Sequence, residues 1–561
     1  MGVYDSEGRW GTSEDSIAHT AEHYFQQLFT SSHPITIDGV INSVDRLVTP
    51  GMNATLLQRY TPKEVKTALF QMHPSKSPGP DGMTPFFFQK YWHIVGRDVT
   101  VAVLSVLNSG HMLRKMNHTH IILIPKKNDP KHMSDFRPIS LANVVSRIMS
   151  KVLANRLKII LPNVISDAQS AFVPNRLITD NTTVAYELLH RLRSKRKGRK
   201  GHIAVKLDIS KAYDRVEWTF LQRMMVKLGF DPNWVHLAME TVTTASYSIL
   251  INGEPRGFVT PTRGIRQGDP LFLYLFLLCA EGLSVLLRKA GEARVLKGIK
   301  SCQHGVWVSH LLFADDSLLF CQPTVEERQR LLQLLEQYEA TSGQAINLQK
   351  TTLFFSNNTK QEVKESLKQL FGARIMTECE RYLGLPMATG KSKVNTFKNL
   401  QEKITKRVME WKEKFISKAE REILIKTVAQ AISTYSMSIF KLPNSICDNI
   451  NSLLAKYWWG QTQAERKLPW INWRKLCMAK KEGGMGFRDL HAFNLAMLAK
   501  QAWRLIHENH SLFYRVYKAH YFPKCSFMFV ELGNNPSFVC HSLLAARDLI
   551  REGSRWQVGG G

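Results

Sequence analysis

The residues of this chain that are best suited to chemistry are two adjacent carboxylates, Asp315 and Asp316, which lie between two apolar runs. Short apolar runs bounded by polar residues predict buried strands, so we expect the pair at the tip of a β-hairpin. Adjacent carboxylates repel each other unless a cation neutralises them, and Mg²⁺ is commonly held by carboxylates, waters and phosphate oxygens. A surface turn is the competing interpretation, because Asp is a common turn residue.

A third carboxylate, Asp208, follows an apolar run that ends at Leu207. Phosphoryl transfer by two metal ions needs carboxylates from separate elements that converge on ions about 3.5–4 Å apart. We therefore predict that Asp208, Asp315 and Asp316 hold two Mg²⁺ ions, with Mn²⁺ as an alternative ion. The structural interpretation of Asp208 alone is a helix N-cap.

These acids lie within sequences that resemble one known family. F-A-D-D at residues 313–316, preceded by L-D-I-S-K-A-Y-D at residues 207–214, resembles the palm of a reverse transcriptase. More narrowly, the chain resembles the reverse transcriptase of plant LINE-type, non-long-terminal-repeat (non-LTR) retrotransposons. Five further stretches match that family in order: Lys76–Gly82, Asp135–Leu141, Gly264–Leu271, Tyr382–Pro386 and Glu482–Phe487. The resemblance implies RNA-directed DNA polymerase activity, with an RNA template, a DNA primer and deoxynucleoside triphosphates (dNTPs) as partners.

The resemblance also implies a fold. It is the α+β right-hand polymerase fold, with helical fingers, a palm built on an antiparallel sheet, a helical thumb and a helical C-terminal segment. The implied division of the chain is a connecting region (1–59), fingers (60–200), palm (201–372), thumb (373–480) and a C-terminal extension (481–561). Longer relatives carry an endonuclease before this region and a cysteine/histidine-rich segment, sometimes with an RNase H domain, after it. We therefore expect a fragment of a longer element or a truncated reading frame.

Residues around the acids are assigned to the incoming nucleotide by the same resemblance. Arg137 and one of two adjacent lysines, Lys126 or Lys127, are expected to bind the triphosphate, since Lys offers a point charge and Arg a bidentate contact. Tyr213 is expected beneath the sugar, where it excludes a 2′-hydroxyl, and Gln267 and Gly268 are expected to line the nucleotide. Surface charge is the alternative for the two basic residues, and core packing is the alternative for Tyr213.

Other basic residues are expected to serve the leaving group and the nucleic acid. Lys350 matches a lysine that protonates the departing pyrophosphate in related polymerases, and a cation there is chemically sensible. Arg266 lies at the entrance of a predicted helix, which suits a template contact. A lysine-rich helix predicted over residues 391–426 has an apolar face and can follow a duplex backbone. Its candidate nucleic-acid-binding residues are Lys403, Lys406 and Lys412.

The sequence departs from the family directly after Leu271. Ser-Pro usually follows there, but this chain has Phe272-Leu273. Proline suits the first turn of a helix, so we expect its absence to loosen the helix predicted over residues 271–287 and Phe272 to add bulk near the pocket. Two alternatives therefore stay open: a catalytically inactive, retroelement-derived nucleic-acid-binding protein, and an intron-maturase-like protein that binds a structured RNA.

Composition favours a nucleic-acid partner. The 561 residues carry a formal net charge of +28, from 75 basic and 47 acidic side chains, and such an excess favours a polyanion. We recognise no signal peptide or membrane span, because the longest apolar run, Leu271–Ala280, is too short to cross a bilayer. We therefore expect a nuclear or cytoplasmic protein without a membrane partner.

The eight cysteines form no C-x-x-C, which predicts neither a zinc knuckle nor a disulfide framework. Core packing is predicted for Trp458, Trp459, Trp470 and Trp473.

Overall fold

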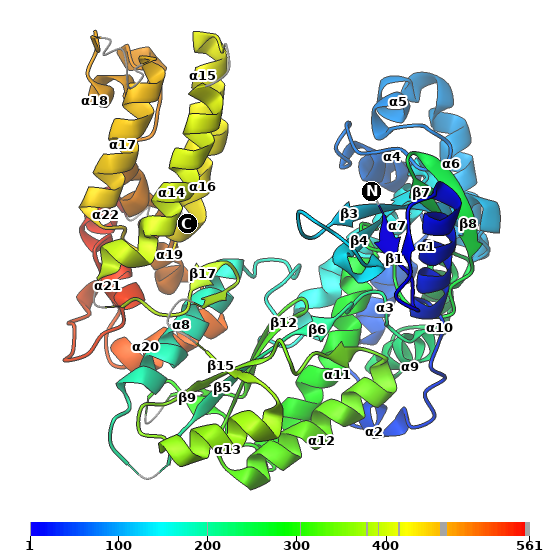
Figure 1. Cartoon of the computed structure of the whole chain (residues 1–561), viewed down its shortest axis with the longest axis horizontal. Coiled ribbons are helices and arrows are strands. Elements are labelled where there is room, and N and C mark those ends of the chain that lie inside the picture. The colour runs from blue at the N-terminus through cyan, green and yellow to red at the C-terminus, as the bar shows by residue number, and fades with distance from the viewer. Residues whose placement is uncertain are drawn as a thin grey trace, which may run out of the picture.

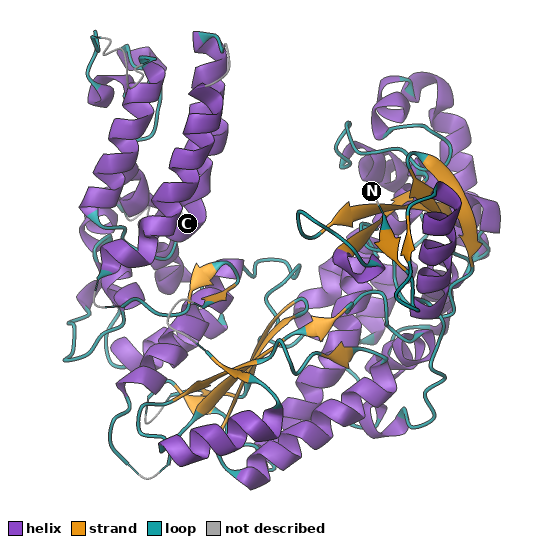
Figure 2. Ribbon diagram, viewed as in Figure 1, coloured by secondary structure: helices purple, strands orange, loops and turns teal. Residues whose placement is uncertain are grey.

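A computed structural model describes residues 2–198, 200–302, 305–376, 380–390, 392–412, 416–460 and 468–555. Figure 1 shows an N-terminal lobe and a C-terminal lobe rising from opposite ends of a central lobe. Strands are concentrated in one sheet of the N-terminal lobe and one sheet of the central lobe, whereas the C-terminal lobe is almost entirely helical (Figure 2). The described structure is therefore mixed helix and sheet.

The sheet of the central lobe has five described strands and separates two hydrophobic cores. In spatial order they are β11 (His310–Phe313), β12 (Asp316–Cys321), β5 (Ile203–Leu207), β14 (Thr352–Phe355) and β15 (Arg374–Ile375). Neighbours are antiparallel except β14 and β15. Successive side chains of a strand point to opposite faces. Val205 and Leu319 thus lie in one core, and Ala204 and Phe320 lie in the other.

Helices cover both faces of this sheet. The first core is shared with α9 (Trp218–Leu228), α11 (Phe272–Glu292), α12 (Val325–Ser342) and α13 (Gln361–Phe371). The second core joins the sheet to α8 (Ile178–Ser194) and to the C-terminal lobe. The sequence interpretation placed α8 in the fingers, but its buried face packs with the C-terminal lobe.

The N-terminal lobe is built around a four-stranded sheet, ordered β4 (Phe136–Ala142), β3 (His118–Pro125), β7 (Ser246–Ile251) and β8 (Glu254–Val259). Helix α1 (Glu14–Leu28) covers one face, where Phe25 shares a core with Ile121 and Tyr247. The first residues of the chain are therefore a structural layer of this lobe, although the sequence was interpreted as a connecting region there.

Most other elements of the N-terminal lobe are helices, and one helix start shows how the local sequence fixes them. Thr61 accepts a hydrogen bond from the Glu64 amide at 3.3 Å, and the Glu64 carboxylate accepts one from the Thr61 amide at 2.9 Å. This capping box satisfies two otherwise unpaired amides. The helices are α3 (Pro50–Leu57), α4 (Pro62–Phe70), α5 (Pro85–Lys90), α6 (Trp92–Ser109), α7 (Val144–Val164) and α10 (Pro232–Thr243). The short helix α2 (Asp38–Ile41) packs instead against α9, α11 and α12 of the central lobe.

The C-terminal lobe is one packed helical unit. Its core includes Ile404, Ile450 and Leu498, so packing continues across residue 480, where a boundary was predicted. The basic helix predicted over residues 391–426 is described as two helices, because α14 ends at residue 412 and α15 begins at residue 418. The helices are α14 (Lys393–Lys412), α15 (Lys418–Leu424), a π-helical turn (Ile425–Ala429), α16 (Gln430–Met437), α17 (Asn444–Trp458), α18 (Trp473–Leu476), α19 (Leu490–His507), α20 (Leu512–Tyr521), α21 (Phe538–Leu544) and α22 (Arg547–Gly553).

Several local predictions have clear outcomes. Residues 382–385 form a tight hairpin between β16 (Arg381–Tyr382) and β17 (Leu385–Pro386). Trp458 is buried, but Trp470 is 84% exposed, so the prediction of core packing is wrong for Trp470. No helix within the described ranges is long and apolar enough to cross a membrane. The seven described cysteines are free, and Cys379 lies outside the described residues.

Candidate active site

The acidic pair lies at the tip of a β-hairpin, as predicted. Strands β11 and β12 pair so that Phe313 is opposite Asp316, which leaves Ala314 and Asp315 as the turn. Ala314 has φ = 53°, in the left-handed region, and its amide donates to Oε1 of the buried Gln169 at 3.1 Å. The turn is thus held from the side of the protein core.

A cavity of about 740 Å³ opens beside this hairpin and gathers most of the predicted site residues. It receives Asp315 from the hairpin and Asp208 from the end of β5, and its wall includes the loop that follows β5 and the start of β4. Among the predicted residues, its lining contains Lys126, Arg137, Asp208, Tyr213, Gln267, Asp315 and Lys350.

Asp316 lies outside the lining of this cavity. Burial and the charge of Asp315 raise the pKa of Asp316, whereas the charge of Lys206 lowers it. Strand alternation explains this placement, because neighbouring residues at a strand end point to different sides. No three His, Cys, Asp or Glu side chains form a ready set of metal ligands within the described ranges. The charge of Asp208 also raises the pKa of Asp316, so the three carboxylates lie near one another although only Asp208 and Asp315 line the cavity. The three-carboxylate metal site stays a prediction.

The environment of Asp315 disfavours its charge, and Asp208 contributes to this. Burial is the main cause that raises the pKa of Asp315, and the negative charge of Asp208 raises it further. Lys350 Nζ lies 3.8 Å from Asp208 Oδ2, so one cation already stands beside the acids. Two carboxylates that disfavour each other's charge are a fitting donor set for a hard divalent cation completed by water and phosphate oxygens.

Tyr213 forms part of the cavity wall rather than of the core alone. Its ring stacks on Phe276 of α11, with centroids 4.3 Å apart and an angle of 20° between the planes. Burial, followed by the charge of Asp315, raises the pKa of Tyr213 well above its usual value. The ring is therefore a neutral, rigidly supported surface close to the acidic turn.

Gln267 is oriented by a carboxylate that the sequence interpretation did not single out. Its side-chain amide donates to Asp214 Oδ1 at 2.9 Å, and its backbone carbonyl accepts from the Ser140 backbone amide at 3.1 Å. Burial raises the pKa of Asp214 to about 6. Gly268 has φ = 104°, which glycine adopts without strain, but it does not line the cavity. Asp214 could have been found from the sequence, because it is the second acid of the L-D-I-S-K-A-Y-D stretch.

Two basic residues of the N-terminal lobe reach the cavity. Lys126 Nζ donates to the Ser134 carbonyl at 2.9 Å, and burial lowers the pKa of Lys126, as does the charge of Arg137. Arg137 lies at the start of β4 with an exposed side chain. The neighbouring Lys127 is instead engaged with Asp135 at 2.9 Å. Lys126 and Arg137 are therefore the cations that this part of the lobe presents to an anionic ligand.

The predicted template contact of Arg266 is wrong, because its side chain is only 1% exposed. Its guanidinium lies 3.3 Å from the Asp269 carboxylate and also donates to Thr119 and to the Thr241 carbonyl, each at 3.2 Å. A buried guanidinium is commonly paired and hydrogen-bonded in this way. Arg266 thus fixes the loop that carries Gln267.

Phe272 likewise points into the protein. It is 1% exposed, packs against the Arg266 guanidinium at 4.9 Å from the ring centroid, and does not line the cavity. The Leu271 amide donates to Asp269 Oδ1 at 3.0 Å, so α11 begins at Phe272 without a proline. The expectations of a bulky pocket and a loosened helix are therefore not supported by this geometry.

The candidate nucleic-acid-binding lysines lie on the outer face of α14. Lys403 and Lys406 are exposed, whereas Ile404 and Val408 are buried on the opposite side. The side chain of Lys412 lies outside the described residues. Helix α14 therefore presents a basic face to solvent, as its spacing predicted.

Comparisons with known proteins agree with this site. Residues 124–387 match the family described as reverse transcriptase (RNA-dependent DNA polymerase), a range that contains both carboxylates and every predicted nucleotide-binding residue. An uncharacterized mitochondrial protein of Arabidopsis thaliana is 39% identical over 132 residues, which cover 86% of its length and 23% of this chain. The chain therefore carries a reverse transcriptase domain and belongs to the reverse transcriptase family.

Similarity to retrotransposon proteins extends beyond that domain. The transposon TX1 uncharacterized 149 kDa protein of Xenopus laevis is 28% identical over 497 residues, which are 87% of this chain and 36% of that protein. The retrovirus-related Pol polyprotein from the type-2 retrotransposable element R2DM of Drosophila melanogaster is 26% identical over 391 residues, 68% of this chain and 35% of that protein. The chain thus spans about a third of the length of these two relatives.

Proposed function

We propose that this chain is an RNA-directed DNA polymerase of a non-LTR retrotransposon. The observation that carries the proposal is one cavity that joins two carboxylates to several cations, within a range that matches the reverse transcriptase family. Carboxylates suit the metal ions of nucleotidyl transfer, and cations suit a triphosphate. The similarity to a Pol polyprotein of a retrotransposable element supports the element class, and the Arabidopsis relative supports a plant source.

In this proposal the lobes correspond to the parts of a right-hand polymerase. The N-terminal lobe acts as fingers, the central lobe as the palm, and the C-terminal lobe as a thumb that includes the residues beyond 480. Template and primer lie between the lobes, with exposed Lys403 and Lys406 beside the phosphate backbone. These contacts position a duplex without reading its sequence.

Asp208, Asp315 and Asp316 would hold the two Mg²⁺ ions. When bound, such ions make the primer 3′-hydroxyl a better nucleophile and stabilise the charge that develops on the transferred phosphate. Asp208 and Asp315 line the cavity, and Asp316 lies beside it, where the charges of Asp208 and Asp315 act on it.

The chain's own residues perform the remaining tasks. Arg137 and Lys126 bind the triphosphate, and the Tyr213 ring, supported by Phe276, forms the surface beneath the sugar. Asp214 holds Gln267 in position toward the nucleotide. Lys350, 3.8 Å from Asp208, donates a proton to the departing pyrophosphate.

The test is primer extension on poly(rA)–oligo(dT) with Mg²⁺ and dTTP. Extension by the wild-type chain that disappears in Asp315→Asn supports the proposal. Tight, salt-sensitive binding of the template–primer without extension would contradict it and favour an inactive nucleic-acid-binding protein. Selective binding to one structured intron RNA would favour a maturase-like protein instead.

A further inference from the structure

Lys211 carries an ammonium group without a hydrogen-bond acceptor among the described residues. The residue lines the catalytic cavity, and its Nζ is shielded from solvent. The nitrogen lies 4.6 Å from the ring centroid of Tyr24, which is a cation–π contact. An ammonium has three donors, and burying a charge without an acceptor is costly. The position is therefore one that an anionic ligand would stabilise.

The backbone at Lys211 is also unusual. Its φ of 50° lies in the left-handed region, which residues other than glycine adopt infrequently. The Lys211 carbonyl accepts from the Asp214 amide at 3.0 Å, which closes the turn after β6 (Ile209–Ser210). The turn places the lysine side chain, rather than leaving it to find its own place on a flexible surface.

The charges around Lys211 favour an anion at this end of the cavity. Burial lowers the pKa of Lys211 to about 8, Asp214 raises it, and Lys126 and Arg215 lower it further. Asp214 is already engaged with Gln267 at 2.9 Å. The cavity lining contains more cations than carboxylates: Lys126, Arg137, Lys211, Arg215 and Lys350 against Asp208, Asp214 and Asp315.

Lys211 and the acidic turn respond to different charges of the same cavity lining. The charges that act on Lys211 are those of Asp214, Lys126 and Arg215, whereas Asp315 responds to Asp208 and Arg137. Both residues line the cavity, so a nucleotide whose α-phosphate lies at the carboxylates can place its terminal phosphates at the cations around Lys211.

Tyr24 reaches the cavity because α1 is fixed to the central lobe. Beyond the end of α1, Ser31 Oγ donates to Glu217 Oε2 at 2.6 Å and the Ser32 amide donates to Glu217 Oε1 at 3.0 Å. Glu217 is 1% exposed and also pairs with Arg263 at 3.3 Å. This buried connection holds the tyrosine over the turn that carries Lys211.

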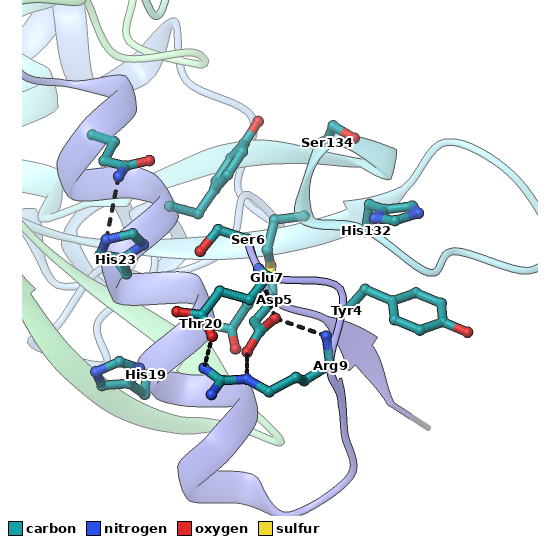
Figure 3. A pocket seen from close by; sticks show the side chains of 13 residues that line it. Tyr4, Asp5, Ser6, Glu7, Arg9, His19, Thr20, His23, His132 and Ser134 are labelled. Atoms are coloured by element: carbon teal, nitrogen blue, oxygen red, sulfur yellow. Dashed lines mark hydrogen bonds and ion pairs between the residues drawn. The ribbon is translucent and has the colours of Figure 1, made fainter.

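On its other side, Tyr24 borders a second cavity of about 310 Å³, which Figure 3 shows from close by. The acids there are already paired, because Arg9 lies 2.8 Å from Asp5 and 3.0 Å from Glu7. The two cavities share Tyr24 and Ser134 in their linings. The second cavity therefore supplies no unpaired carboxylate from these two acids to neutralise Lys211.

We propose that Lys211 binds the terminal phosphates of the incoming dNTP and that Tyr24 positions its ammonium group. The inference rests on the proposed polymerase function and adds two residues to its nucleotide site. It also gives the N-terminal helix α1 a part in substrate binding. Lys211 is the binding residue, and Tyr24 acts through it as a positioning residue.

The test measures nucleotide affinity at equilibrium, so that it does not depend on catalysis. The full chain is bound to poly(rA)–oligo(dT) with a dideoxy-terminated primer, and dTTP and dTMP compete with a fluorescent dTTP analogue. Lys211→Met is expected to weaken dTTP binding about tenfold or more, because a charge-assisted phosphate contact is lost. The affinity for dTMP should stay within about twofold of wild type, since dTMP lacks the terminal phosphates.

Matched variants separate the binding role from a structural one. Lys211→Arg is expected to retain most of the dTTP affinity, because the positive charge is kept. Tyr24→Phe is expected to retain all of it, because the aromatic ring is kept. Tyr24→Leu removes the ring and should weaken dTTP binding several-fold with dTMP unaffected. Thermal unfolding of each variant checks that the fold is intact.

Two results would overturn the inference and differ in what else they overturn. In the first, the wild-type chain binds template–primer and dTTP, but Lys211→Met has unchanged dTTP affinity or loses affinity equally for dTTP and dTMP. This result would refute the role of Lys211 alone. Wild-type chain that binds the template–primer but neither nucleotide would refute both this role and the proposed polymerase function.

Discussion

The cations of the catalytic cavity and those of helix α14 are held in different ways. In the cavity, Lys126 donates to a carbonyl, Lys211 lies against an aromatic ring, and Lys350 stands beside Asp208. On α14, Lys403 and Lys406 project from an exposed face. The first group is placed by specific contacts, whereas the second is placed only by the helix that carries it.

The difference indicates two kinds of recognition within one basic protein. A cation fixed by neighbours can recognise a phosphate at one location, which suits a small substrate that must be aligned for chemistry. Exposed cations along a helix attract a regular polyanion wherever it presents a phosphate, and salt weakens them. The net charge of +28 therefore does not describe one uniform surface.

The largest effect is expected from replacing the two neighbouring acids one at a time. Asp315→Asn should lower primer extension by about 1,000-fold or more, equivalent to about 4 kcal/mol in the barrier, because a cavity carboxylate is lost. Asp316→Asn should lower it less, because that side chain lies beside the cavity and does not line it. Single-turnover extension rates measure both variants. Equal losses in the two would contradict the assignment of the cavity to Asp315.

The second effect concerns a cation that looks like a ligand-binding residue in the sequence but is buried. Arg266→Met should lower the free energy of unfolding by about 3–5 kcal/mol, since Asp269 is left as a buried, unpaired charge. Urea unfolding at neutral pH measures it. Lys403→Met is the matched control on an exposed helix face and should change stability by about 0.5 kcal/mol or less. A comparable loss in both variants would show that burial does not distinguish them.

Arg266 also marks where sequence interpretation reached its limit. The hairpin at Asp315 and the strand before Asp208 followed from apolar periodicity and turn residues, which act locally. Whether an arginine at a helix entrance points outward or inward depends on Thr119 and Thr241, which lie on other elements. No spacing around Arg266 contains that information.

The same limit applies to the site as a whole. The motifs identified Asp208, Tyr213, Gln267 and Asp315, because each belongs to a short stretch with a recognisable pattern. Tyr24 reaches the cavity only through the packing of α1 on a sheet whose strands are more than ninety residues further along. A contact between segments so far apart is a property of the fold and leaves no mark on the local sequence.

A third prediction uses a buried acid outside the cavity. Burial raises the pKa of Glu281 to about 7, although the Ser166 amide donates to it at 3.0 Å. Between pH 4.5 and 7 the folded chain keeps this proton and the unfolded chain does not, so stability falls as pH rises through that window. The total for this group is on the order of 3 kcal/mol.

Glu281→Gln removes that titration and keeps a hydrogen-bond acceptor for the Ser166 amide. The loss of stability between pH 5 and pH 8, measured by urea unfolding, should therefore be smaller in the variant than in wild type. Glu326→Gln, at an exposed position on α12, is the matched control and should leave the pH dependence unchanged. An unaltered pH dependence in Glu281→Gln would show that the buried acid does not titrate in this range.

The smallest effect is expected on α14 and separates the two kinds of cation most directly. The double variant Lys403→Gln/Lys406→Gln should reduce the slope of log affinity against log salt by about 2 for a template–primer, because each lysine neutralises about one phosphate. Affinity for dTTP should not change, since neither side chain lines the cavity.

Lys368→Gln on α13, which lies on the outer side of the central lobe in Figure 1, is the matched control and should leave the slope unchanged. Fluorescence anisotropy across a salt series measures all three. Equal slopes in the double variant and the control would show that α14 does not follow the nucleic acid, and the basic residues that bind the duplex would then have to lie on another face.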